Sequence, residues 1–251
     1  MIERIHKGGV AILTLANGKA NTMDIELCQA VINQFDELRS SAAQAVVLTG
    51  QGSIFSAGVD LVRTSDGGSS YIRKFLPVLN AMFEVVFHFP KPVVAAINGH
   101  AIAGGCVLAC CTDRRLMTRD SGRIGVTELL VGLPFPALAF EVMRCVTAAR
   151  YFPRAIYGGE TYSPEGGAER GWVDEVVSPA DLIARAVASA QTLATLPATT
   201  FAMTKRQMQW PVSEWMAREG RHIDVAVTEI WAAPEATARI CDYVARTFKK
   251  R

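Results

Sequence analysis

Two short runs of apolar residues constrain the fold of this chain more than any other feature of its sequence. Ala45–Thr49 reads AVVLT and is followed by Gly50, and Val93–Ile97 reads VVAAI and is followed by the turn-forming pair Asn98-Gly99. A run of about four to eight apolar residues, rich in β-branched side chains and bounded by turn residues, is typical of a strand covered on both faces. We therefore predict two fully buried strands.

Helical patterns lie before and between these strands. Apolar residues recur at helical spacing from Leu27 to Leu38, and Asp24 or Thr22 can cap the helix that this spacing predicts. A second amphipathic helix is predicted for about Tyr71–His88, after a glycine- and serine-rich loop, Thr64–Ser70, that we interpret as a mobile cover for a site. The alternation of strand and helix favours an α/β fold.

Weaker patterns predict three more strands and a helical tail. The strands are Val10–Leu15, Arg114–Met117 and Trp172–Val177, and the chain from Pro179 onward is predicted to be mostly helical. The large apolar residues of this tail are Trp210, Trp215, Ile230 and Trp231. Because a monomer would not bury all of this apolar surface, we interpret the tail as a subunit interface.

Composition excludes several classes of protein. Half of the 251 residues are apolar, a fifth are charged and the net charge is +2, which is the balance of one soluble globular unit without a nucleic-acid partner. The six cysteines show no CxxC spacing and no signal peptide precedes them, so we expect reduced thiols and no metal site. No run approaches the ~20 apolar residues of a membrane span, and we expect a cytoplasmic enzyme.

Two glycine-containing turns offer backbone N–H groups to a ligand. In Ile54–Leu61 (IFSAGVDL), Gly58 permits a tight turn that leaves the N–H of Val59 pointing outward. In Gly99–Ala109 (GHAIAGGCVLA), Ala103-Gly104-Gly105 immediately precedes a helix, so free N–H groups coincide with the positive end of the helix dipole. Either turn alone is more often ordinary turn chemistry, whereas the two together favour a functional site.

The ordered segments FSAGVDL, KPVVAAINGHAIAGGC and VTELLVGLP resemble those of the crotonase (enoyl-CoA hydratase/isomerase) superfamily, from Val10 to about Val177. NGKANTMD, CTDRRLM and ERGWVDEVV are also similar to segments of that family. The resemblance implies a ClpP/crotonase-like ββα superhelix, with a core over residues 1–195 and a C-terminal helical trimerisation region, 196–251. It further implies an acyl-CoA substrate, homotrimers or dimers of trimers, and no cofactor, since coenzyme A is part of the substrate.

The same resemblance assigns roles to single residues. The N–H groups of Val59 and Gly104 would form an oxyanion hole for the thioester oxygen, in which each donor is typically worth about 3–4 kcal/mol. Glu128, set among apolar neighbours in GVTELLVGLP, would be the acid/base, with a raised pKa. The residues expected to bind substrate or coenzyme A are Lys19, Ala20, Ala57, Gly58, Asp60, Leu61, Gly105, Tyr243 and Arg246, the last two being equally well explained as solvated helix residues.

One position departs from the pattern of the family's hydratases. Those enzymes have a glutamate after GGC, whereas Val107 follows Cys106 here. Hydration divides its proton transfers between two positioned groups, while shifting a double bond from the 3 to the 2 position needs one base, which Glu128 supplies. Enoyl-CoA isomerase is therefore the leading hypothesis, with enoyl-CoA hydratase, acyl-CoA thioester hydrolase and non-catalytic acyl-CoA-binding protein as alternatives.

Overall fold

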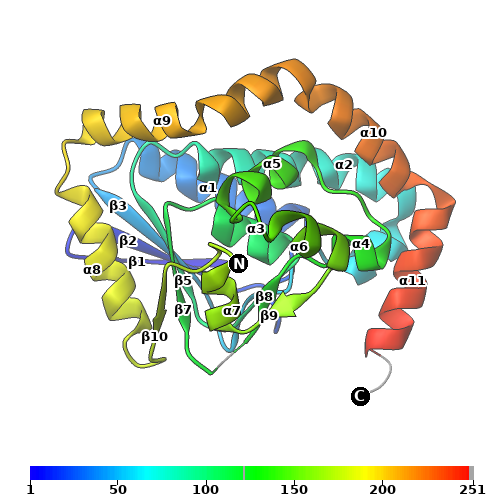
Figure 1. Ribbon diagram of the computed structural model, residues 1–251, viewed down its shortest axis with the longest axis horizontal. Coiled ribbons are helices and arrows are strands. Elements are labelled where there is room, and N and C mark those ends of the chain that lie inside the picture. The colour runs from blue at the N-terminus through cyan, green and yellow to red at the C-terminus, as the bar shows by residue number, and fades with distance from the viewer. Residues whose placement is uncertain (121, 249–251) are drawn as a thin grey trace.

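A repeated strand–strand–helix pattern runs through most of the chain (Figure 1). The computed structural model describes residues 1–120 and 122–248, so residues 249–251 of the expected C-terminal region lie outside it. The strands are β1 (Ile2–Lys7), β2 (Val10–Leu15), β3 (Ala45–Gly50), β4 (Ile54–Ser56), β5 (Val93–Ile97), β6 (His100–Ile102), β7 (Arg114–Thr118), β8 (Ile124–Gly125), β9 (Thr161–Tyr162) and β10 (Glu175–Val177). The helices are α1 (Ile25–Arg39), α2 (Leu61–Phe87), α3 (Gly104–Cys110), α4 (Glu128–Val131), α5 (Ala137–Val146), α6 (Phe152–Gly158), α7 (Pro164–Glu169), α8 (Leu182–Ala194), α9 (Ala198–Trp215), the π-helix η1 (Met216–Gly220), α10 (Arg221–Ala232) and α11 (Pro234–Phe248).

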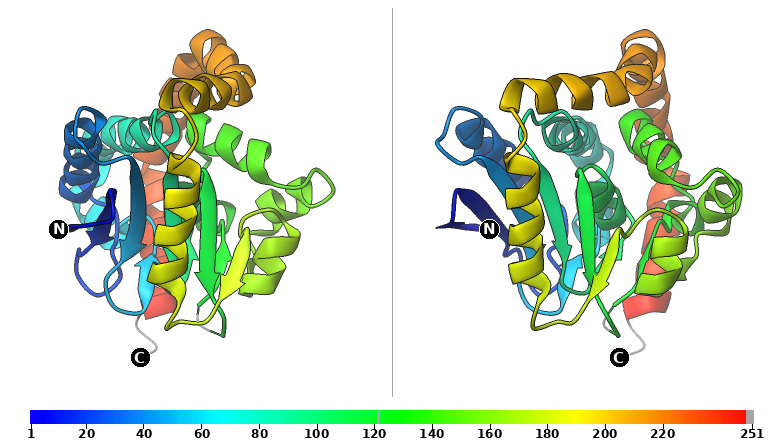
Figure 2. Two further views of the ribbon diagram at one scale, coloured as in Figure 1. Left: turned by 90° about the vertical axis from the view of Figure 1, so that its left-hand side faces the viewer. Right: turned by 60° about the vertical axis from the view of Figure 1, so that its left-hand side comes forward.

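The larger sheet has the strand order β1-β2-β3-β5-β7-β10 and is parallel except at β1. Every residue of β3 and β5 is buried, which confirms the two predicted buried strands and the α/β fold class. One face of the sheet packs against α8, through Ala186 and Val187 among others, and the opposite face packs against α1, through Val31 and Phe35 (Figures 1 and 2). The helices on both faces explain why these strands are almost wholly apolar, the polar side chain being that of Thr49, whose hydroxyl donates to the carbonyl of Ala96 at 2.8 Å.

The smaller sheet fixes where the turns of interest lie. Its order is β4-β6-β8-β9, and β4, β6 and β8 are parallel to one another. Each of these three strands follows a strand of the larger sheet and leads into a helix, giving β3-β4-α2, β5-β6-α3 and β7-β8-α4. Because parallel strands end at the same edge of a sheet, the turns after β4, β6 and β8 come together there.

Two predicted elements differ from the structure. The segment Thr64–Ser70 is not a loop, because α2 begins at Leu61, where Asp60 caps it by accepting a hydrogen bond from the N–H of Arg63 at 2.9 Å. The glycines there only interrupt the helix, with a non-helical conformation at Gly68. The strand predicted for Trp172–Val177 is limited to β10, and Trp172, which lies before it, is fully buried.

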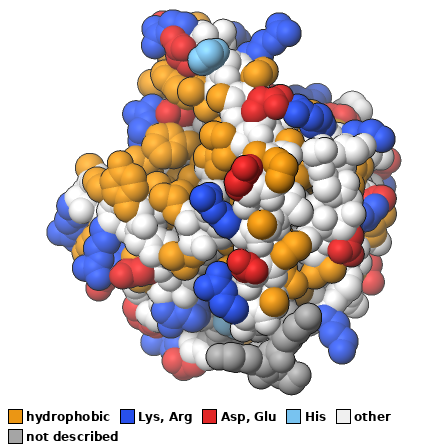
Figure 3. All heavy atoms as spheres, turned by 90° about the vertical axis from the view of Figure 1, so that its right-hand side faces the viewer, with side chains coloured by type: hydrophobic (Ala, Val, Ile, Leu, Met, Phe, Trp, Pro, Cys, Tyr) orange, Lys and Arg blue, Asp and Glu red, His pale blue; other side chains and the backbone are white. Residues whose placement is uncertain are grey.

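The tail from α9 to α11 crosses α2 and α5 and then descends beside α4 (Figure 1). A buried ion pair of 3.0 Å between Lys205 and Asp113 ties α9 to the segment before β7. On the face formed by α10 and α11, hydrophobic side chains lie among charged ones (Figure 3). Trp210 is 56% exposed, as the interface interpretation expects, but Trp231 is 2% exposed, and for this residue the interpretation is wrong.

The expected boundary at residues 195 and 196 falls between α8 and α9. No helix in the described ranges is long and apolar enough to cross a membrane.

Candidate active site

The turns after β4 and β6 touch through their backbones. Gly58 has a φ of +82°, and a Cβ atom on it would lie 3.0 Å from the nitrogen of Gly104 and 2.8 Å from the carbonyl oxygen of Ile102. A real Cβ atom does not fit at the shorter of these distances, so the approach requires glycine. The two N–H groups named in the sequence therefore lie in adjoining turns.

Both of those N–H groups lack an acceptor within the described part of the chain. Around Val59, the N–H of Asp60 donates to the carbonyl of Met23 at 3.0 Å, and that of Met23 donates to Gly58 at 2.8 Å. Since successive N–H groups of an extended chain point to opposite sides, the N–H of Val59 points away from Met23. Gly104 is the first residue of α3, so its N–H has no acceptor inside the helix.

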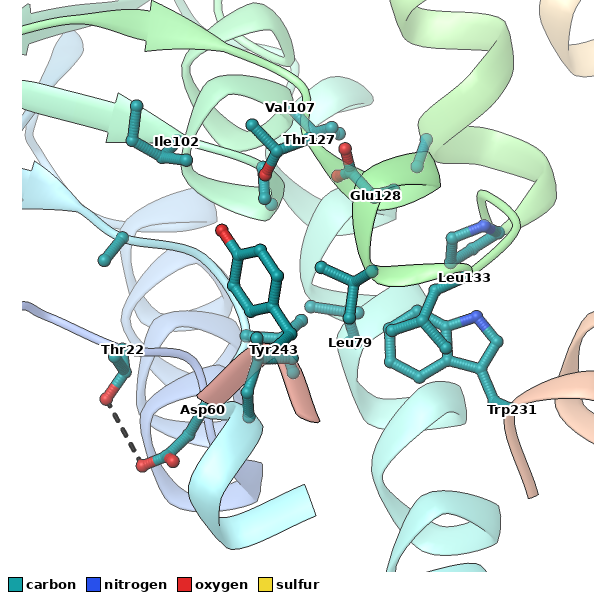
Figure 4. A pocket seen from close by; sticks show the side chains of 18 of the residues that line it. Thr22, Asp60, Leu79, Ile102, Val107, Thr127, Glu128, Leu133, Trp231 and Tyr243 are labelled. Carbon is teal, nitrogen blue, oxygen red and sulfur yellow. Dashed lines mark hydrogen bonds between the residues drawn. The ribbon is translucent and has the colours of Figure 1, made fainter. Parts of the chain in front are cut away.

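A cavity of about 340 Å³ lies beside these N–H groups and is mostly apolar (Figure 4). The expected site residues that line it are Val59, Gly104, Glu128, Ala57, Asp60, Leu61 and Tyr243. Those that do not are Lys19, Ala20, Gly58, Gly105 and Arg246. The structure thus brings the expected catalytic residues together and leaves part of the expected binding set outside the cavity.

The residues outside the cavity have other contacts. Lys19 is exposed, and the carbonyl of Ala20 accepts a hydrogen bond from the N–H of Ala57 at 3.0 Å, which supports the first turn. A Cβ atom on Gly105 would lie 2.2 Å from the carbonyl oxygen of Ser56, so Gly105 allows α3 to pack on β4. Arg246 is exposed, and its Nε donates to the carbonyl of residue 242 at 3.2 Å.

Glu128 is the first residue of α4, and its carboxyl group lies beside Val107 and Thr127 (Figure 4). The Oε2 atom of Glu128 is buried, and the described residues offer it no hydrogen-bond partner. Burial raises the pKa of Glu128 to about 7, although the backbone N–H groups of Glu128 and Thr127 act in the opposite direction. Such a pKa suits a group that accepts and returns a proton near neutral pH.

The other carboxylate that lines the cavity is engaged elsewhere. Asp60 caps α2 and accepts a hydrogen bond of 3.4 Å from the hydroxyl of Thr22 (Figure 4). Val107 is 1% exposed and lines the cavity from α3, close to Glu128. Among the described residues that line the cavity, Glu128 is therefore the one carboxylate free for proton transfer.

The tail contributes two aromatic side chains to the cavity. Tyr243 projects into it from α11, with its hydroxyl directed toward the region of Ile102 and Thr127 (Figure 4). Trp231 enters from α10, and its Nε1 donates a hydrogen bond of 2.9 Å to the carbonyl of Pro134. Sequence reasoning assigned Trp231 to a subunit interface and did not consider Thr127, although its place next to Glu128 was a usable signal.

In the described part of the chain, no three His, Cys, Asp or Glu side chains are arranged to hold a metal ion.

Comparisons with known proteins find a matching family and several relatives. Residues 5–237 match the family model described as Enoyl-CoA hydratase/isomerase. The chain is 30% identical to a putative enoyl-CoA hydratase of Thermus thermophilus, over 80% of this chain and 81% of that protein. It is 26% identical to enoyl-CoA delta isomerase 1, mitochondrial, of Mus musculus, over 90% of this chain and 78% of that protein.

A likeness in structure accompanies the likeness in sequence. The crystal structure of human mitochondrial delta3-delta2-enoyl-CoA isomerase matches with a TM-score of 0.93 at 21% identity, covering 100% of this chain and 99% of that chain. The predicted ββα superhelix is thereby confirmed. The names of the relatives divide between hydratase and isomerase, and so do not choose between the two reactions.

The contact between the two turns gives a stability prediction with a matched control. Gly58→Ala and Gly52→Ala both place an alanine at positive φ, +82° and +73°, at a cost of about 1 kcal/mol each. Only Gly58→Ala also forces a Cβ atom against backbone, since nothing lies within 4 Å of that position on Gly52, and overpacking costs about 1–3 kcal/mol more. Urea unfolding should show the larger loss for Gly58→Ala, and equal losses would contradict the contact.

The raised pKa of Glu128 gives a second prediction. Between about pH 4.5 and 7 an unfolded glutamate is ionised while the folded Glu128 still holds its proton, so the parent loses stability as the pH rises through this range. Glutamine does not titrate, and the stability of Glu128→Gln relative to the parent should rise by about 3 kcal/mol from pH 4 to pH 8. A pH-independent difference in the free energy of unfolding would contradict the burial of the carboxylate.

Proposed function

The chain belongs to the enoyl-CoA hydratase/isomerase family, and on that premise we propose that it is an isomerase that converts a 3-enoyl-CoA into a 2-enoyl-CoA. The observation that carries the proposal is a single free carboxylate, Glu128, in an apolar cavity beside two unpaired backbone N–H groups. Val107 lines that cavity where the family's hydratases would have a second carboxylate. Isomerisation needs one acid/base and an oxyanion hole, and these residues supply both.

In the proposed mechanism the thioester oxygen accepts hydrogen bonds from the N–H groups of Val59 and Gly104. The ionised Glu128 removes a proton from carbon 2, and the electron pair of that C–H bond moves toward the thioester, giving a dienolate whose charge the two donors stabilise. Glu128 then returns the proton to carbon 4, which leaves the double bond between carbons 2 and 3. The donors belong to folded turns and need no reorganisation as the charge develops.

Hydration is the second candidate, because relatives named as hydratases are as similar as those named as isomerases. Adding water requires one group to take a proton from water and a group to deliver a proton to carbon. The hydroxyl groups of Thr127 and Tyr243 lie in the cavity, and that of Thr127, next to Glu128, is placed to orient a water molecule. A hydroxyl is a much weaker base than a carboxylate, so we rank hydration below isomerisation.

A non-catalytic acyl-CoA-binding role fits the cavity less well. Burying a carboxylate with one oxygen, Oε2, lacking a hydrogen bond destabilises the folded state, and strongly perturbed groups of this kind cluster at functional sites. No feature of the cavity favours the thioester hydrolase. The homotrimer or dimer of trimers stays a proposal, supported by the exposed side chains of Met203, Met208 and Trp210 on α9. The cytoplasmic location also stays a prediction.

The isomerase proposal predicts the effect of removing the base. Glu128→Gln keeps the shape of the side chain but accepts no proton, so kcat on a 3-enoyl-CoA should fall by about 10²–10⁴-fold. The assay follows formation of the conjugated thioester, and binding of a saturated acyl-CoA serves as the control for an intact cavity. Full isomerase activity in Glu128→Gln would reject the proposal, and faster turnover of a 2-enoyl-CoA with water by the parent would favour the hydratase.

The pH dependence of the reaction should report the same group. Proton abstraction needs the carboxylate form, and the pKa of Glu128 is raised to about 7 by burial. We expect kcat/KM for a 3-enoyl-CoA to rise with pH through about 7 and to level off above it. A profile that is flat from pH 5 to pH 9, or one that falls over this range, would exclude Glu128 as the base.

A further inference from the structure

The cavity has an open end and a closed end. At one end Val62 is 50% exposed, and Thr22, Asp60 and Leu61 are partly exposed, so solvent and ligand enter there. At the other end the lining residues Leu133 and Trp231 are 3% and 2% exposed. Figure 4 shows Thr22 and Asp60 at one side of the cavity, Leu133 and Trp231 at the other, and Tyr243 and Leu79 between them.

This order dictates how a thioester would lie, if the proposed function is right. The nucleotide part of coenzyme A is large and charged and must remain at the open end. The thioester oxygen meets the N–H groups of Val59 and Gly104, so the acyl chain continues past Glu128 to the closed end. The side chains there are hydrocarbon, apart from the indole N–H of Trp231. That N–H already donates its hydrogen bond to the carbonyl of Pro134. The closed end is therefore built for an apolar chain.

Two hydrogen bonds fix the position of Trp231, one made by its indole ring and one made by an earlier residue of α10. Its Nε1 donates to the carbonyl of Pro134 at 2.9 Å, which joins α10 to the segment between α4 and α5. Two helical turns before Trp231, Asp224 accepts a hydrogen bond of 2.8 Å from the N–H of Ala137, which joins α10 to the start of α5. Swinging the indole aside would leave the buried N–H without an acceptor, and the ring is thus a fixed wall.

We propose that Trp231 closes the acyl pocket and sets an upper limit to the length of the acyl chain. Up to that limit each added methylene buries apolar surface and tightens binding about fourfold. Beyond it the chain has no space, and the extra carbons must distort the packed wall or stay in water. The specificity for chain length therefore resides in α10, within the C-terminal tail, while the proposed chemistry resides in the turns after β4, β6 and β8.

Four proteins test this: the parent, Trp231→Leu, Ala139→Leu and Trp210→Ala. Ala139 is 2% exposed and lines the cavity from α5, so a leucine there reduces its volume, whereas a leucine at position 231 enlarges it. Trp210 is 56% exposed on α9 and does not line the cavity, so Trp210→Ala is the control for loss of a tryptophan outside the cavity. The probes are saturated acyl-CoA thioesters from butanoyl- to hexadecanoyl-CoA, with binding measured by calorimetry and turnover measured on 3-enoyl-CoA thioesters of the same lengths.

In the parent, affinity should rise with chain length and then stop rising at one length. Trp231→Leu should move that length upward by two or more methylenes, Ala139→Leu should move it downward, and Trp210→Ala should leave it unchanged. An unchanged limit in Trp231→Leu would overturn the proposal. An unchanged limit in Ala139→Leu would do so too, even if Trp231→Leu does not fold, because the acyl chain would then not occupy this cavity. If the limit in binding shifts but no variant turns over a 3-enoyl-CoA of any length, the isomerase proposal is rejected and the role of Trp231 stands. If turnover is seen but the limit does not shift, the role of Trp231 is rejected and the isomerase proposal stands.

Discussion

The contact between two backbones, at Gly58 and Gly104, is the constraint on which the site depends. The turns that carry these glycines approach so closely that a Cβ atom on Gly58 would lie 3.0 Å from the nitrogen of Gly104. That approach exists because β4 and β6 are parallel neighbours and end at the same edge of the smaller sheet. Everything else follows from it: the N–H of Val59 and that of Gly104 lie in adjoining turns, and α3 begins where its dipole adds to them.

The electrostatics of the cavity depend on what it lacks as much as on what it contains. Two unpaired N–H groups favour negative charge at one point, and an apolar lining disfavours charge elsewhere. Glu128 is subject to the second of these influences, since burial raises its pKa, while a different pair of N–H groups, those of Glu128 and Thr127, limits the rise. A second carboxylate in the position of Val107 would repel the first and raise the pKa of one of the two still further. With valine at position 107, the pKa of the single base, Glu128, stays at about 7.

Local patterns explain which parts of this arrangement could be predicted from sequence. β3 and β5 were predictable because both faces of each strand are covered, so the residues are buried and nearly all apolar. The Thr64–Ser70 segment was misassigned because its glycines disfavour helix locally, whereas the cap at Asp60 starts α2 before this segment and the buried residues from Ile72 onward anchor the helix after it. The free N–H groups were predictable in kind from glycine positions. Their contact was not, since it depends on the pairing of strands that are distant in sequence.

Trp231 is a second case in which local sequence could not predict a contact between distant segments. An apolar tail residue with no local partner is indistinguishable by pattern from an interface residue, and Trp210 and Trp231 look alike in the sequence. Only the path of α10 over α2 and α5 separates them, leaving one 56% exposed and burying the other in the wall of the cavity. Because α10 lines one end of the cavity while Glu128 and the two N–H groups belong to the ββα turns, substitutions in α10 can alter the shape of the cavity without touching those groups. Under the proposed function, such substitutions would change the range of acyl chains and keep the chemistry.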